Sequence, residues 1–70
     1  MSGNIAIVVN GESREAPSGA TVEQLLESLG LPRGRVAIER NLAILPRNAW
    51  GETRVTAGDR YEIVQFVGGG

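Results

Sequence analysis

One short segment carries the pattern of an amphipathic helix, and it limits the folds that this chain can adopt. Thr21 and Gln24 have the spacing of a capping box, in which each side chain bonds the backbone N–H of the other residue. The apolar residues that follow form one helical stripe, Val22, Leu25, Leu26 and Leu29. Gly30 stands where a helix ends in a left-handed residue, and Pro32 prevents it from resuming. A helix with one apolar face needs one sheet face to cover it.

Short extended segments are predicted on both sides of this helix. Before it, residues 5–9 alternate with one strongly apolar face, and Asn10-Gly11 accepts the positive φ angles of a tight hairpin turn. Residues 12–16 are polar and predict the second arm of the hairpin, at a sheet edge. After the helix, further extended segments are predicted over residues 36–39, 42–45, 53–56 and 61–67.

This order of elements, a hairpin, a helix and then three or four short strands, predicts the α+β class. We expect a β-grasp (ubiquitin-like) fold, in which a mixed sheet of four to five strands packs on the one helix. The 70 residues allow one domain, expected over residues 1–67, followed by a flexible C-terminal glycine tail over residues 68–70. The residues expected in the core are Ile5, Ile7, Val9, Val22, Leu25, Leu26, Leu29, Val36, Ile38, Val55, Tyr61 and Ile63.

The composition excludes most kinds of catalytic and metal-binding site. The sequence contains no cysteine and no histidine, which excludes thiolate zinc sites, cysteine nucleophiles and the commonest general base. All seven cations are arginine, which excludes a Schiff-base lysine. No pair among the eight carboxylates falls in a recognisable catalytic motif, so an enzyme is the least favoured interpretation.

The charge and the N-terminal pattern limit the partners and the location. A net charge of −1 gives no field that would attract nucleic acid or an anionic membrane, so neither is expected as a partner. The apolar run at residues 5–9 follows no basic segment and is too short for a secretory signal or a membrane span. We expect a cytoplasmic chain.

The last predicted strand has two different faces. Tyr61 and Ile63 lie on one face, and Glu62, Val64 and Phe66 lie on the other. An unpaired glutamate is rarely buried, so the face that carries Glu62 is predicted to meet solvent. The two apolar residues that share this face are then exposed directly ahead of the terminal glycines.

Exposed apolar residues leading into a tail indicate a docking surface for a partner protein. We expect this surface to include Val64, Phe66 and Val67. An equally weighted alternative is that a loop covers the face, with the loop that carries Trp50 as the candidate.

The terminal glycines offer chemistry that no side chain here supplies. Because glycine has no Cβ, Gly68, Gly69 and Gly70 can thread a narrow channel in extended form. From Val67 the tail reaches at most roughly 13 Å. A partner enzyme could hold the folded body and activate the Gly70 carboxylate as an acyl phosphate or adenylate. The alternative is a frayed end without function.

Several segments together resemble the ThiS family, the ubiquitin-like sulfur carrier proteins of thiamine biosynthesis. The resemblance covers nearly the whole chain, and Pro46-Arg47 followed by Trp50 is its most discriminating part. Trp50 is expected to cap the core in any case. The matching segments are Asn10-Gly11, residues 21–26, residues 36–41, residues 45–47 with Trp50, Gly58-Asp59, and residues 61–64 running into Gly68–Gly70.

The resemblance implies a carrier that holds no cofactor and is not itself an enzyme. It implies that a ThiF-like adenylating enzyme uses ATP to adenylate the carboxylate of Gly70, which sulfur then converts to a thiocarboxylate. The sulfur comes from cysteine, through a desulfurase or a sulfurtransferase. A thiazole synthase (ThiG-like) then takes the sulfur to build the thiazole ring. Gly68 and Gly69 form the tail that enters the partner enzymes.

Two other interpretations stay open at this point. A carrier of the MoaD type, the small subunit of molybdopterin synthase, would use the same chemistry. Such chains are usually longer and carry prolines before the glycines, where this chain has residues 65–67. A non-catalytic β-grasp binding module with a passive tail would keep its activity without Gly69 and Gly70, whereas a carrier would lose sulfur transfer.

Overall fold

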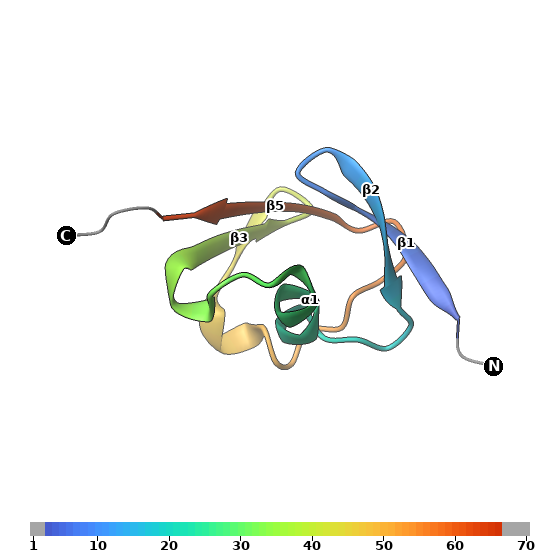
Figure 1. Cartoon of the computed structure of the whole chain (residues 1–70), viewed down its shortest axis with the longest axis horizontal. Coiled ribbons are helices and arrows are strands. Elements are labelled where there is room, and N and C mark those ends of the chain that lie inside the picture. The colour runs from blue at the N-terminus through green and yellow to red at the C-terminus, as the bar shows by residue number, and fades with distance from the viewer. Residues whose placement is uncertain (1–2, 67–70) are drawn as a thin grey trace.

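A mixed five-stranded sheet wraps around one helix in the computed structural model, which describes residues 3–66 (Figure 1). The strand order is β2-β1-β5-β3-β4, with β1 and β5 parallel at the centre and the other neighbours antiparallel. This is the predicted β-grasp fold. The elements in chain order are β1 (Asn4–Val9), β2 (Glu12–Pro17), α1 (Val22–Leu29), the 3-10 turn η1 (Arg33–Arg35), β3 (Val36–Arg40), β4 (Ala43–Leu45), the 3-10 turn η2 (Arg47–Ala49) and β5 (Arg60–Gln65).

The predicted signals at both ends of α1 are confirmed. Thr21 Oγ1 accepts a hydrogen bond from the Gln24 N–H at 3.1 Å, and Gln24 Oε1 accepts one from the Thr21 N–H at 3.0 Å. Gly30 adopts φ 73°, and its N–H bonds the last carbonyls of the helix. The helix therefore begins and ends at positions fixed by local sequence, with its apolar stripe turned toward the sheet.

The core lies between α1 and the concave face of the sheet. All the predicted core residues are buried except Ile5 and Leu29, which are half-buried and pack against the rest. Trp50 is buried as expected, and its Nε1 donates to the Leu45 carbonyl at 3.1 Å. Ala16 and Ala20 are also buried, although the sequence did not single them out.

The strand predictions differ from the structure mainly at their ends. Residues 53–56 form no strand and contribute one isolated bridge, between Arg54 and Thr21. Leu42 belongs to the turn before β4, with φ 74°. The last strand ends at Gln65, and the Phe66 N–H bonds the Arg35 carbonyl at 2.7 Å.

A side chain extends the central parallel pairing of β1 and β5. Asn10 adopts φ 50° in the predicted hairpin turn before Gly11. Its Oδ1 accepts from the Ile63 N–H at 2.7 Å, and its Nδ2 donates to the Ile63 carbonyl at 3.1 Å. The backbone pairing of β1 with β5 ends at Val9 and Tyr61. The Asn10 side chain continues it by bonding the backbone of Ile63, as a further residue of β1 would.

Asp59 is the one buried charged side chain among residues 3–66, with 5% of its surface exposed. It accepts hydrogen bonds from the Thr56 N–H at 2.9 Å, the Tyr61 hydroxyl at 2.8 Å, Arg40 Nε at 3.1 Å and Asn41 Nδ2 at 3.2 Å. Burial alone would raise the pKa of Asp59, but these donors outweigh it and hold the pKa below its usual value. Burial raises the pKa of Tyr61 to about 12, and its bond to Asp59 adds to this rise.

We expect Asp59→Asn to lower the free energy of unfolding by about 1–3 kcal/mol near pH 7, because hydrogen bonds to a charged group are lost. A carboxyl whose pKa is depressed by folding stabilises the fold above its unfolded pKa and loses this effect as the pH falls. The difference between wild type and variant, measured by urea unfolding, should therefore shrink below about pH 4. Glu12→Gln, at an exposed residue of β2, is the control; an equal difference at both pH values would contradict this account.

Candidate functional site

The sheet face turned away from α1, called here the outer face, carries exposed apolar side chains. Val64 is 57% exposed, Phe66 54% and Ile44 69%. The predicted exposure of Val64 and Phe66 is confirmed, and the alternative that the Trp50 loop covers them is wrong. That loop instead buries Trp50 in the core. Ile44 is an additional member of the surface.

A shallow apolar groove of about 370 Å³ runs over this surface between β3, β4 and β5. We call it the outer groove. Its lining residues are Ala37, Ile38, Glu39, Ile44, Glu62, Val64 and Phe66. A second hollow of about 310 Å³ shares Ile44 and Phe66 with it and extends to Pro46 and Trp50. The exposed apolar residues therefore belong to one continuous surface.

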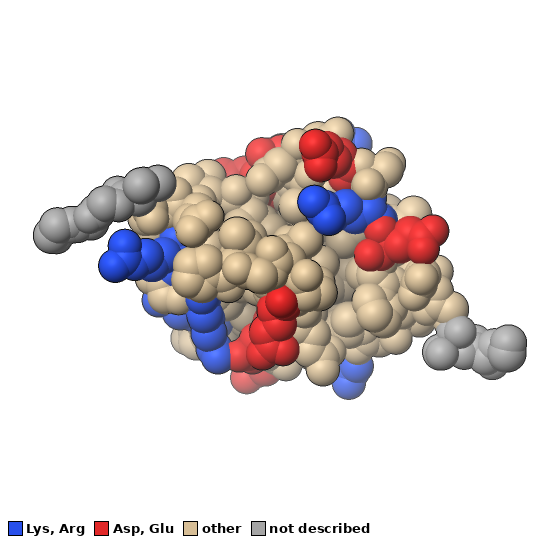
Figure 2. Space-filling view, viewed as in Figure 1, with Lys and Arg blue, Asp and Glu red and all other residues tan. Residues whose placement is uncertain are grey.

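The end of β5 is fixed at the rim of this surface. The bond from the Phe66 N–H to the Arg35 carbonyl anchors the last described residue beside η1. Basic side chains gather at this end of the molecule (Figure 2). Arg33 pairs with Glu23, and the Arg47 guanidinium lies over the Trp50 ring, 5.4 Å from its centroid. The predicted site residues Val67, Gly68, Gly69 and Gly70 lie outside the described residues.

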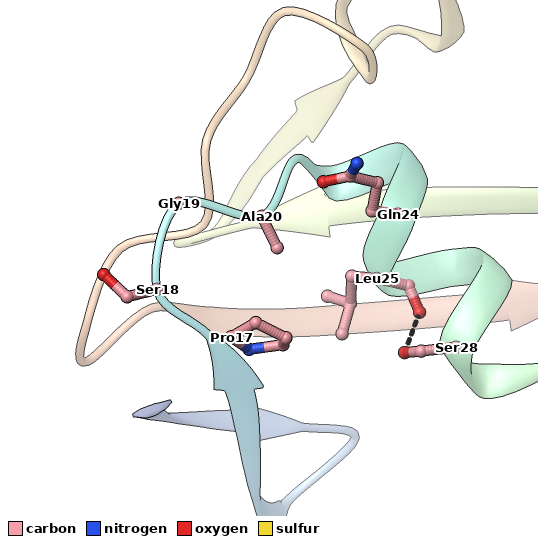
Figure 3. A pocket seen from close by; sticks show the side chains of 7 residues that line it. All are labelled: Pro17, Ser18, Gly19, Ala20, Gln24, Leu25 and Ser28. Carbon is pink, nitrogen blue, oxygen red and sulfur yellow. Dashed lines mark hydrogen bonds between the residues drawn. The ribbon is translucent and has the colours of Figure 1, made fainter. Parts of the chain in front are cut away.

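Another pocket, of about 400 Å³, lies between the β2–α1 loop and the helix (Figure 3). It shares no lining residue with the outer groove. Two of its polar side chains already make hydrogen bonds within the chain. Gln24 is used in the helix cap, and Ser28 Oγ donates to the Leu25 carbonyl at 2.7 Å. No ionisable group lines the pocket, so it offers no general acid or base and nothing to activate the hydroxyls of Ser18 and Ser28.

Within residues 3–66 the structure contains no group of three or more side chains that could hold a metal ion. Every buried side-chain nitrogen or oxygen in this part of the chain has a hydrogen-bond partner. No helix in the same range is long and apolar enough to cross a membrane. Among the described residues, the outer face and the strand end beside it therefore form the candidate functional site.

Comparisons with known proteins give the family. A sequence model of the ThiS family matches residues 7–70. The chain belongs to the ThiS family. It is 33% identical over 64 residues to the sulfur carrier protein ThiS of Escherichia coli, covering 91% of this chain and 97% of that protein. A crystal structure of the thiamine biosynthesis protein ThiS from Geobacter metallireducens superimposes with a TM-score of 0.80 at 32% identity, covering 94% of this chain and 100% of that one.

Longer relatives contain a ThiS-like segment. The chain is 47% identical over 64 residues to a protein named thiazole synthase from Paramagnetospirillum magneticum. The aligned residues make up 91% of this chain. The chain spans about a fifth of the length of that relative and of a second thiazole synthase, from Magnetococcus marinus. The family predicted from the sequence motifs is therefore confirmed, and so is the fold.

Leu42 stands at the tip of the turn between β3 and β4, near the outer face. It adopts φ 74° and is 93% exposed. Asn41 precedes it with φ 52° and is held there by its bonds to Asp59 and Arg60. A leucine tolerates a left-handed backbone poorly, so Leu42 reduces the stability of the turn.

We expect Leu42→Gly to raise the free energy of unfolding by about 1 kcal/mol, because glycine adopts a positive φ without steric strain. Equilibrium urea denaturation measures the change. Ala43→Gly, one residue along in β4, is the matched control and should lower stability by about 0.5–1 kcal/mol. A loss of stability in both variants would contradict the strained-turn interpretation.

Proposed function

We propose that this chain is a sulfur carrier protein of thiamine biosynthesis and that its reacting group is the carboxylate of Gly70. The observation that carries the proposal is the match to the ThiS family through residue 70. The relatives from Escherichia coli and Bacillus subtilis that bear the name sulfur carrier protein ThiS support it. The chain acts as a carrier and is not itself an enzyme.

The chemistry takes place at the end of the backbone. A carboxylate is a poor electrophile, so a ThiF-like adenylating enzyme first joins it to AMP from ATP, with release of pyrophosphate. A persulfide, formed on the desulfurase or sulfurtransferase with sulfur from cysteine, then attacks the carbonyl carbon, and AMP leaves to give an acyl disulfide. A second thiol cleaves the S–S bond, is itself oxidised to a disulfide with the donor protein, and leaves the terminal sulfur on the carbonyl carbon. The product is a thiocarboxylate on Gly70. ATP is thus used by the partner enzyme and is not a cofactor of the carrier.

The folded body and the tail have different roles. Residues 1–67 form the domain that partners grip, with docking at Val64, Phe66 and Val67. Residues 68–70 form the tail that enters the partner, with Gly68 and Gly69 in its narrow entrance. Burial of the exposed Val64 and Phe66 supplies binding energy away from the reacting atom, which positions the carboxylate. The carrier operates in the cytoplasm, where ATP is available.

A thiazole synthase is the partner that receives the sulfur. Support comes from the two relatives named thiazole synthase, each of which contains a segment similar to this chain. A ThiG-like enzyme that accepts the loaded tail would keep the sulfur bound throughout, because the thiocarboxylate stays attached to the carrier.

Incubation with the ThiF-like enzyme, ATP, cysteine and a desulfurase should exchange one carboxylate oxygen for sulfur. Intact-protein mass spectrometry detects this exchange as a single mass shift. A variant that lacks Gly69 and Gly70 should keep the circular dichroism spectrum of the wild type and show no shift. An unchanged mass in the wild type with every such enzyme of the same cell would contradict the carrier function.

We expect Gly69→Val to reduce the initial rate of sulfur loading by roughly tenfold or more, because a branched side chain widens a tail that must fit a narrow channel. The thermal unfolding midpoint should stay that of the wild type. Gly3→Val is the matched control, because the space around Gly3 is open and its φ is not left-handed. Equal loading rates for Gly69→Val and the wild type would refute the threading role.

A further inference from the structure

Two glutamates face each other on the outer face without a counter-ion. Glu39 of β3 and Glu62 of β5 are directly paired in the antiparallel register, which places their side chains side by side. Neither forms an ion pair or a side-chain hydrogen bond within residues 3–66. Like charges in directly opposite positions destabilise a sheet, so this arrangement reduces the stability of the free chain.

The arginines nearest to this pair do not neutralise it. Arg40 follows Glu39 in β3, but alternation turns its side chain to the other face, where it bonds Asp59 at 3.1 Å. Arg60 lies on the same face as Glu62 and forms no ion pair with it within the described residues. The pair thus contrasts with Glu23, which is neutralised by Arg33.

The two carboxylates also line the outer groove. Ile44 lies opposite Glu39 on β4, and Val64 lies two residues beyond Glu62 on β5. A partner that covered this groove with apolar side chains alone would remove water from two unpaired carboxylates, which is energetically unfavourable. A partner that fits the groove must therefore bring positive charge to the glutamate pair.

We propose that the outer groove receives a surface of the thiazole synthase that places an arginine or lysine side chain between Glu39 and Glu62. Apolar side chains of that surface cover Ile44, Val64 and Phe66. This inference rests on the proposed function, from which it takes the partner. The charge complementarity of the groove identifies the chemistry of the surface that binds it.

The charge distribution also sets the orientation of the partner. The glutamate pair lies on the outer face, while η1 and η2 bring Arg35 and Arg47 near the end of β5. A cationic side chain of the partner is attracted to the pair and repelled from the strand end. Electrostatic complementarity of this kind fixes the register of a complex. Here it would direct the end of β5 toward one fixed side of the partner.

The test is a calorimetric titration of the whole chain with the ThiG-like thiazole synthase of the same cell. The double variant Glu39→Gln, Glu62→Gln should bind about tenfold more weakly than the wild type and lose most of the salt dependence of binding. Its free energy of unfolding should equal or exceed that of the wild type, because the repulsion is gone. If the two glutamates acted in folding alone, the double variant would be less stable than the wild type and its binding would keep the same salt dependence.

The double variant Glu27→Gln, Glu52→Gln is the matched control, because it also removes two carboxylates, from exposed residues outside the outer groove. It should bind the synthase as the wild type does. Equal affinity and equal salt dependence for the wild type and the double variant would overturn the proposal, and so would a wild type that does not bind the synthase. Sulfur loading by the ThiF-like enzyme is measured separately, so a failure of the carrier function is distinguished from a failure of this docking.

Discussion

The chain has one helix and a sheet with two faces, and this constraint shapes the rest of the structure. The eight residues of α1 cover the concave face and form the core with it. Nothing within residues 3–66 covers the apolar part of the outer face, where Ile44, Val64 and Phe66 stay more than half exposed. Because exposed apolar side chains favour association, the face that the helix leaves open is the face available to partners.

Buried polar contacts place the last strand on this framework. Asp59 accepts hydrogen bonds from the turn before β5 and from the end of β3. On the β1 side of β5, Asn10 bonds the backbone of Ile63. The strand β5 pairs with β3 over residues 61–65 and with β1 at its first two residues, and the Arg35 carbonyl bonds the Phe66 N–H just beyond its end. A strand fixed in this way gives the residues after it a defined starting point relative to the docking surface. The fold and the proposed chemistry are connected at this strand.

Local signals in the sequence predicted much of this architecture. The helix limits, the first hairpin and the exposure of Val64 and Phe66 depend on neighbours close in sequence, so spacing alone was informative. The contacts of Asp59 and the pairing of Glu39 with Glu62 depend on strand register between distant segments, which a single sequence does not reveal. The roles of Gly68–Gly70 came from the family resemblance and from the chemistry of a free carboxylate, and they remain predictions.

In the proposed function, the reaction occurs at the backbone terminus, and the folded body is the part that other proteins bind. Fragmentation mass spectrometry of the sulfur-loaded chain tests it most directly, because it assigns the added sulfur to one residue. We expect all of the sulfur to reside on the carbonyl carbon of Gly70. Sulfur assigned to any other residue, or equal loading of a chain whose Gly70 carboxylate is amidated, would contradict it.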